Sequence, residues 1–212
     1  MFTPTHKKNG MLFGLLMRAS QAYADTQISE DTNHVIKYMG DHKVSSFIMI
    51  DKKMGQTHLI ENGKVKSTFN ALSGKIAGDG IEGGMTPAGV FSLERVDGLP
   101  TYQSALIFNY KSETNKYTAI HAVLDVKGEN RSARLTSKTA TDNKISHDGC
   151  INVFAKDLKA MLEFTTNASK YIHTDRNDYF YAPNGFLVVL PEKSNATTFF
   201  KIQTQTATTE PH

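Results

Sequence analysis

The chain has 212 residues, of which 39% are hydrophobic and 21% are charged, a composition typical of a globular protein with its own core. This length suits one medium domain with terminal additions, or at most two small domains. The formal net charge is only +3, and no run of Lys or Arg alternates with aromatic residues, so we expect no nucleic-acid partner.

The first 24 residues have the pattern of a secretory signal peptide. Two lysines precede the apolar run MLFGLLM (11–17), and the small-residue sequence AYA (22–24) follows it. Arg18 cuts the apolar run short, so a short amphipathic N-terminal helix is the alternative. No later segment has the ~20 apolar residues of a spanning helix, so we expect no stable membrane span. The pattern predicts a protein exported to the periplasm or cell envelope.

A helical leader over 25–43 is followed by strands. Residues 28–40 predict a short helix that Ser29 caps and Gly40 ends. Asn62-Gly63 predicts a type I′ hairpin turn between two extended segments. Strands are predicted at 45–51, on both sides of that turn within 56–72, and at 90–96, 104–110, 117–124 and 184–191.

Two loops and a late helix complete the central part of the chain. Residues 73–89 are rich in glycine, and residues 125–145 are polar with almost no apolar periodicity, which predicts a long loop. Residues 155–166 have apolar side chains at helical spacing. The order predicts a mostly β domain over 44–192. The composition of 201–212 is that of a disordered segment, so a flexible tail is expected over 193–212.

The single cysteine, Cys150, lies in the segment SHDGCINV (146–153). One cysteine cannot close an internal disulfide, which leaves a link between two copies, a buried inert thiol or a nucleophile. A nucleophilic thiol needs a neighbour that accepts its proton, and His147 and His121 are both candidates. A tight turn at Asp148-Gly149 would leave backbone N–H groups near the sulfur, where they would hold an oxyanion.

Two alternatives remain open for these side chains. His147 and Cys150 have a spacing that suits metal ligation, but His121 and Asp148 would have to complete the site because no second cysteine is present. A histidine at the end of a strand is also often a structural residue with its hydrogen bonds satisfied.

Several motifs in the same order resemble the L,D-transpeptidase catalytic domain family, penicillin-insensitive enzymes that act on bacterial peptidoglycan. The resemblance covers about residues 44–192. It implies the mostly β fold of that family, a β-sandwich or barrel-like domain with one prominent helix after the nucleophile loop. The matching segments are the opening hairpin IDKKMGQTHLIENGKVKSTFNALSG, then GGMTPAGVFSL, AIHAVL, SHDGCIN and NGFLVVLP.

The resemblance implies cysteine-dependent acyl transfer on peptidoglycan stem peptides through a thioester on Cys150. It makes His121 the general base and gives His147 a part in shaping the site. It also places Asn152 at the polar position that follows the cysteine in the family. No cofactor and no metal are implied. The remaining substrate-binding and oxyanion positions are Ser146, Asp148 and Gly149.

The sequence departs from the family pattern in two places. Asp148 separates His147 from Gly149, whereas the family has His-Gly-Cys contiguous, so the role of His147 is left open. The span between His121 and Cys150 is also longer than usual, and we interpret it as a lid or specificity element. Arg131 and Arg134 in this span either meet a stem carboxylate or form a solvated charged surface.

Two other functions compete with transpeptidation. With water as the acceptor, the same chemistry would make the protein an L,D-carboxypeptidase that trims stem peptides. A scaffold of this kind without catalysis would be a cell-wall-binding module. The sequence leaves open which acceptor is used, which stem peptide is the donor, and the oligomeric state.

Overall fold

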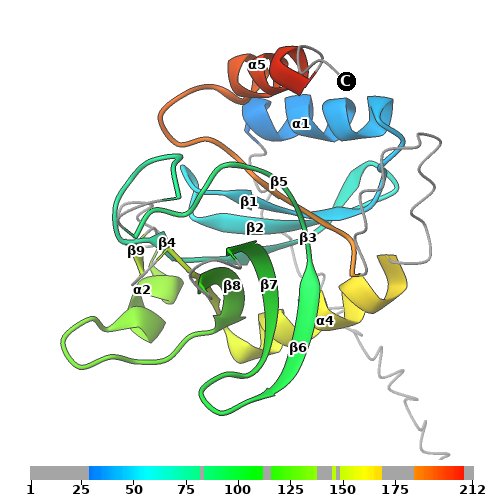
Figure 1. Ribbon diagram of the computed structural model, residues 1–212. Coiled ribbons are helices and arrows are strands. Elements are labelled where there is room, and N and C mark those ends of the chain that lie inside the picture. Colours follow the sequence, from blue (N-terminus) through cyan, green and yellow to red (C-terminus); the bar gives the residue numbers. More distant parts are fainter. Residues whose placement is uncertain are drawn as a thin grey trace, which may run out of the picture.

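The computed structural model describes residues 29–81, 84–111, 116–137, 145–146, 149–168 and 184–207. Most of the elements in these residues are strands (Figure 1). In chain order they are α1 Glu30–Asp41, β1 Phe47–Asp51, β2 Gln56–Glu61, β3 Lys64–Asn70, β4 Ser73–Gly74, β5 Gly89–Ser92, β6 Glu94–Leu99, β7 Gln103–Lys111, β8 Lys116–Ala122, α2 Arg131–Thr136, β9 Ile145–Ser146, β10 Ile151–Val153, α4 Ala155–Ala168, β11 Phe186–Val189 and α5 Ala196–Ala207.

Within the described residues, the strands form two mixed sheets and one short pair. The larger sheet has the order β3-β2-β1-β11-β5, in which only β1 and β11 are parallel. The smaller sheet has the order β10-β8-β7-β6, in which only β10 and β8 are parallel. Strands β4 and β9 pair in parallel. The predicted mostly β fold is confirmed, with α4 following the cysteine segment.

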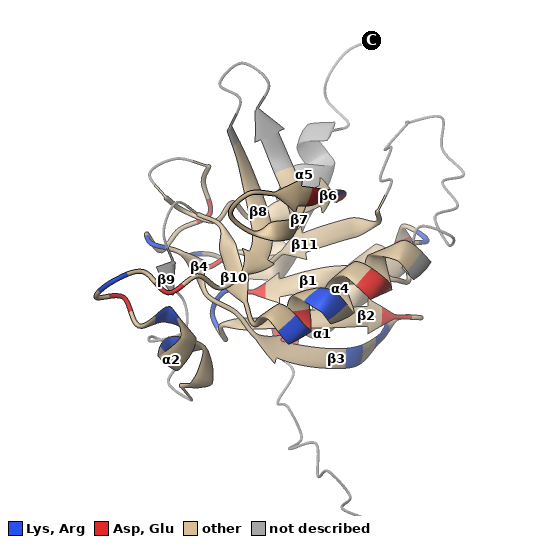
Figure 2. Ribbon diagram, turned by 90° about the horizontal axis from the view of Figure 1, so that it is seen from below, with Lys and Arg blue, Asp and Glu red and all other residues tan. Residues whose placement is uncertain are grey.

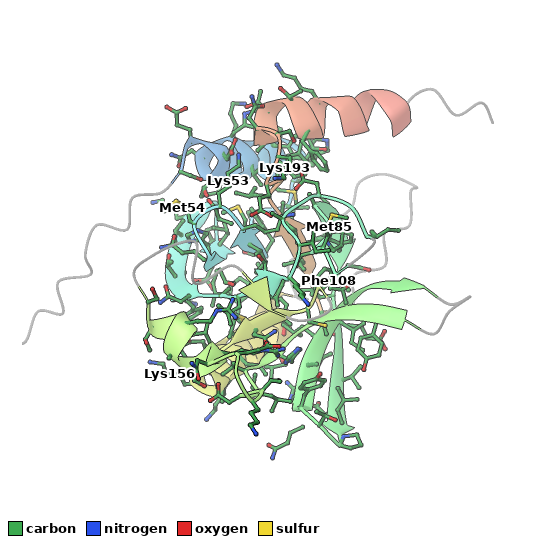
Figure 3. All side chains as sticks on the ribbon, turned by 90° about the vertical axis from the view of Figure 1, so that its left-hand side faces the viewer. Lys53, Met54, Met85, Phe108, Lys156 and Lys193 are labelled. Carbon is green, nitrogen blue, oxygen red and sulfur yellow. The ribbon has the colours of Figure 1, made fainter. Side chains whose placement is uncertain are left out.

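The central strands of the larger sheet are buried on both faces. One face packs with the smaller sheet and α4, and Phe108 of β7 lies in this core (Figure 3). The opposite face packs against α1 and α5, which lie side by side over it (Figure 1). Strands buried on both faces need apolar residues at every position. This explains why β1 and β11 are almost continuous hydrophobic runs rather than alternating ones.

Charged residues lie mainly outside this core. Strands β10 and β11 carry none, whereas α2, α4 and the edge strand β3 carry several (Figure 2). Lysines on an exposed edge discourage pairing with the strand of another molecule. Among the described helices, none has both the length and the apolarity that crossing a bilayer requires.

The predictions for the first helix and for the first hairpin turn are largely confirmed. The Ser29 hydroxyl accepts a hydrogen bond from Thr32 N at 3.1 Å, as a helix N-cap does. The helix continues one residue past Gly40, to Asp41. Asn62 and Gly63 both have positive φ, 53° and 69°, which is the conformation of a type I′ turn.

Three predictions about secondary structure are wrong. The predicted strand 90–96 is two strands in different sheets, because the chain changes sheet at Leu93, whose side chain is buried in the core. The predicted loop 125–145 contains α2, which buries Leu135 and the charged Arg131. The expected flexible tail is helical as far as residue 207, because α5 packs against α1 and the larger sheet through Phe200.

The two terminal helices are also joined by polar contacts. Asp31 of α1 accepts hydrogen bonds from Ala196 N at 2.8 Å, at the start of α5, and from Lys53 Nζ at 3.0 Å. Lys53 lies beside α1 in Figure 3 and also donates to Ser194 O at 2.9 Å. An acidic side chain at the N-terminus of a helix satisfies a free backbone N–H group. Residues 1–24, with the predicted signal peptide, lie outside the described residues.

Candidate active site

The parallel pairing of β8 and β10 brings the predicted nucleophile and base to one face of the smaller sheet. His121 of β8 stands directly opposite Asn152 of β10, and Ile120 stands opposite Ile151. The two isoleucines point into the core, so His121 and Asn152 point away from it. Cys150, two residues before Asn152, falls on this second face and is half-buried. Cys150 is the residue immediately before β10, the strand that pairs with the strand of His121.

The imidazole of His121 is held in one tautomer. Its side chain is only 3% exposed, and Nδ1 lies 2.8 Å from the carbonyl oxygen of Ala122. A carbonyl oxygen can only accept, so Nδ1 carries the proton and Nε2 keeps its lone pair. The ring of Tyr102 packs on the imidazole with centroids 4.0 Å apart. Therefore Nε2 is available to accept a proton from a group on this face.

Two influences favour the neutral form of His121. Burial lowers the pKa of His121 below its ordinary value, and the positive charge of Arg131 lowers it further. The hydrogen bond to Ala122 acts in the opposite direction without reversing the shift. A base must be unprotonated to accept a proton. The surroundings of His121 therefore keep it ready for that role near neutral pH.

The turn before Cys150 is positioned by Thr86. The Thr86 hydroxyl accepts a hydrogen bond from Gly74 N at 2.6 Å and donates one to the carbonyl oxygen of Gly149 at 2.7 Å. Gly149 has φ of +78°, and a Cβ atom there would collide with the carbonyl oxygen of Met85. The backbones of these segments therefore approach too closely for any residue but glycine at position 149.

A buried lysine holds the loop that carries Thr86. Lys52 is 1% exposed, and its ammonium group donates to Thr86 O at 2.8 Å, to Gly78 O at 2.5 Å and to Asp79 Oδ1 at 3.0 Å. Burial lowers the pKa of Lys52, while the Asp79 carboxylate opposes this shift. Asp79 in turn accepts from the backbone N–H of Glu192. The Lys52–Asp79 ion pair thus joins the glycine-rich loop to the segment after β1, and the hydrogen bond from Glu192 joins the same loop to the segment after β11.

Helix α2 covers the same face of the smaller sheet. Arg131 is 5% exposed and donates from Nη1 to Asn152 Oδ1 at 3.2 Å and from Nε to Glu129 Oε2 at 2.6 Å. At the other end of the helix, Asn70 Nδ2 donates to Leu135 O at 2.7 Å. The interpretation of Arg131 as part of a solvated surface is therefore wrong.

The structure brings together four of the predicted site residues: Cys150, His121, Gly149 and Asn152. The backbone of Ser146 pairs with Gly74 in the β4–β9 ladder. His147 and Asp148 lie outside the described residues. Among the side chains that the structure describes, no group of three or more His, Cys, Asp or Glu residues is arranged to hold a metal ion.

Sequence reasoning missed three residues that support the site. Thr86 lies in the Thr-Pro segment that carried the family resemblance, but its contact with Gly149 spans 63 positions and follows no local rule. Lys52 follows a hydrophobic strand, where a charged residue is itself a signal of a buried partner. Tyr102, which packs on His121, has no signal in its own segment.

Comparison with known proteins identifies the class of this domain. The sequence profile of the L,D-transpeptidase catalytic domain family (YkuD) matches residues 45–172, more than half of the chain. The chain therefore belongs to the L,D-transpeptidase catalytic domain family. No curated protein matches the chain.

Similar solved structures carry the same family description. An L,D-transpeptidase from Xylanimonas cellulosilytica shares 15% identity with a TM-score of 0.39, over 69% of this chain and 61% of that chain. The catalytic domain of the Enterococcus faecium L,D-transpeptidase shares 17% identity with a TM-score of 0.41, over 70% of this chain and 99% of that domain. The chain thus spans about three-fifths of the Xylanimonas cellulosilytica chain.

Proposed function

We propose that this protein is an exported cysteine acyltransferase that acts on peptidoglycan stem peptides, with Cys150 as nucleophile and His121 as general base. One observation carries the proposal. The Nε2 atom of a buried histidine is left as an acceptor on the face where the only cysteine lies. Family membership supports the reaction class, since the family is that of L,D-transpeptidase catalytic domains.

The first half-reaction forms a thioester. His121 Nε2 takes the thiol proton of Cys150, and the thiolate attacks the carbonyl carbon of the third, L-configured residue of the stem. Backbone N–H groups at the Gly149 turn hold the resulting oxyanion. The bond to the terminal D-amino acid then breaks, and His121 gives its proton to the leaving amine. The acyl group remains on sulfur.

The second half-reaction releases the acyl group. An acceptor amine attacks the thioester carbon and loses a proton to His121 Nε2. The carbon–sulfur bond breaks, and that proton returns to the sulfur of Cys150. The product is a new amide, which is a crosslink when the amine belongs to a second stem peptide. With water as the attacking group, the same steps give a shortened stem and the activity of an L,D-carboxypeptidase.

The test is intact-mass spectrometry of the protein mixed with muropeptides that carry tetrapeptide stems. We expect an acyl adduct, or loss of the terminal D-amino acid, that disappears in Cys150→Ala and falls at least about a hundredfold in His121→Ala. His42→Ala changes an exposed histidine on the C-cap of α1 and is the matched control. Binding of muropeptides without any Cys150-dependent product would reject catalysis and favour the wall-binding module.

A further inference from the structure

Arg131 occupies an unusual position for an arginine. It is the first residue of α2, in the segment that connects β8 with the cysteine, and it is 5% exposed. A guanidinium group is always charged, and its burial is unfavourable unless its N–H groups are paired. The structure supplies the pairing from two sides, through Glu129 and Asn152.

Asn152 depends on this arginine. Its side chain is fully buried, its Oδ1 atom accepts from Arg131 Nη1 at 3.2 Å, and its Nδ2 atom has no hydrogen-bond partner among the residues that the structure describes. A buried amide that lost its remaining partner would be left unsatisfied and free to reorient. Among the described residues, Arg131 is therefore the hydrogen-bond partner of the Asn152 side chain.

The position of Asn152 makes that control relevant to the reaction. It lies directly opposite His121 in the parallel ladder and two residues after Cys150. Its backbone exchanges two hydrogen bonds with Leu72, both at 2.9 Å, so β10 is fixed between β8 and the segment before β4. Asn152 thus contacts the Arg131 side chain and also pairs with the strand of His121, just after Cys150 in the chain.

We propose that Arg131 is a positioning residue: through Asn152 it aligns Cys150 with His121, and through Glu129 it couples that alignment to the segment 123–137. This inference rests on the proposed function for its biological meaning. The geometry that it describes is testable without any peptidoglycan substrate.

The experiment measures two rates for each variant: alkylation of Cys150 by iodoacetamide, and acylation by the tetrapeptide-stem muropeptide. We expect Arg131→Met to slow both rates by about tenfold to a hundredfold, because small displacements of reacting groups are costly. The muropeptide KM should change much less than kcat. Arg131→Lys keeps the charge and should recover part of the loss. Lys127→Met removes an exposed charge from the same segment and is the matched control.

A double-mutant cycle separates alignment from general damage. If Arg131 acts through Asn152, Arg131→Met combined with Asn152→Ala should alkylate no more slowly than Asn152→Ala alone. Independent, multiplicative losses would overturn the proposal, as would parent-like rates in Arg131→Met. If Arg131→Met fails to fold, parent-like alkylation and acylation in Asn152→Ala would still overturn it, because the proposal acts through Asn152. A parent that is alkylated normally but never acylated would refute the proposed function and leave the positioning test valid.

Discussion

The two ends of the molecule are stabilised in different ways. At the first, which we call the helical end, α1 and α5 cover the larger sheet. The buried contacts there are largely hydrophobic, and Val35, Met49 and Phe200 are fully buried. Around Cys150 the buried contacts are hydrogen bonds and ion pairs, made by Thr86 and Arg131. Hydrophobic burial is non-directional, whereas a hydrogen bond sets distance and angle. We therefore expect changes at the helical end to alter stability alone, and changes at the site to alter the reaction as well.

The largest expected effect tests the helical end. Phe200→Ala should lower the free energy of unfolding by about 3–5 kcal/mol, because the side chain is fully buried between α5, α1 and the sheet. Urea denaturation measures this loss. In the folded protein, the rate of Cys150 acylation should stay within about twofold of the parent, since distant sites act independently.

Phe199→Ala is the matched control for that change. The neighbouring ring is only half-buried, so its loss should be clearly smaller. A large fall in acylation by folded Phe200→Ala would show that the two ends are coupled, and the comparison would fail.

The next effect concerns the Lys52–Asp79 ion pair, which holds the glycine-rich loop that carries Thr86. Lys52→Met should cost about 3 kcal/mol, because Asp79 and two backbone carbonyls lose a buried partner. Acylation should also fall, since Lys52 holds the backbone of Thr86. Lys53→Met is a control at the adjacent position, where the ion pair is 38% exposed on the lysine side and worth at most about 1 kcal/mol. Equal stability of the two variants would contradict the expectation.

A smaller loss of stability with a clear loss of activity is expected at Thr86. Thr86→Val keeps the shape of the side chain but removes both hydrogen bonds, to Gly74 and Gly149. The expected cost is about 1–3 kcal/mol, with acylation slowed by about tenfold as the turn before Cys150 loosens. Thr86→Ser retains the hydroxyl and should restore most of the rate. A Thr86→Ser variant as slow as Thr86→Val would point to the methyl group instead.

The last expected effect is a dependence of the free energy of unfolding on pH. It involves one histidine in the larger sheet and one at the site. Burial lowers the pKa of His58, in the larger sheet, and of His121, at the site. The unfolded chain then binds more protons than the folded protein once the pH falls below about 6.5. Stability should therefore decrease from neutral toward acidic pH, by at most about 1.4 kcal/mol per pH unit for each histidine.

The two histidines are separated by substitution. His58→Gln should weaken the pH dependence of urea denaturation between pH 5 and 8 and leave the pH profile of acylation unchanged. The acidic limb of the acylation profile should belong to His121 alone. A shift of that limb in His58→Gln would contradict this assignment.

Much of the fold was predictable because it follows local rules. The Ser29 cap, the Asn62-Gly63 turn and the apolar run of β1 each need only neighbouring residues to be recognised. Helices α2 and α5 were missed for the opposite reason. Arg131 and Phe200 are buried by segments distant in the chain. The spacing of apolar residues in their own segments does not predict this packing.

For the candidate site, too, some features depend on neighbouring residues and others on contacts between distant segments. The sequence by itself determined which reactive groups are present: one cysteine, the motif around it and an upstream histidine at the end of a strand. Only the tertiary structure decided the geometry, because parallel pairing puts His121 opposite Asn152, and Thr86, Lys52 and Arg131 reach the site across 63, 34 and 21 positions of the chain. A chemical group is a property of one residue, whereas its tautomer, charge and alignment depend on the residues that the fold places around it.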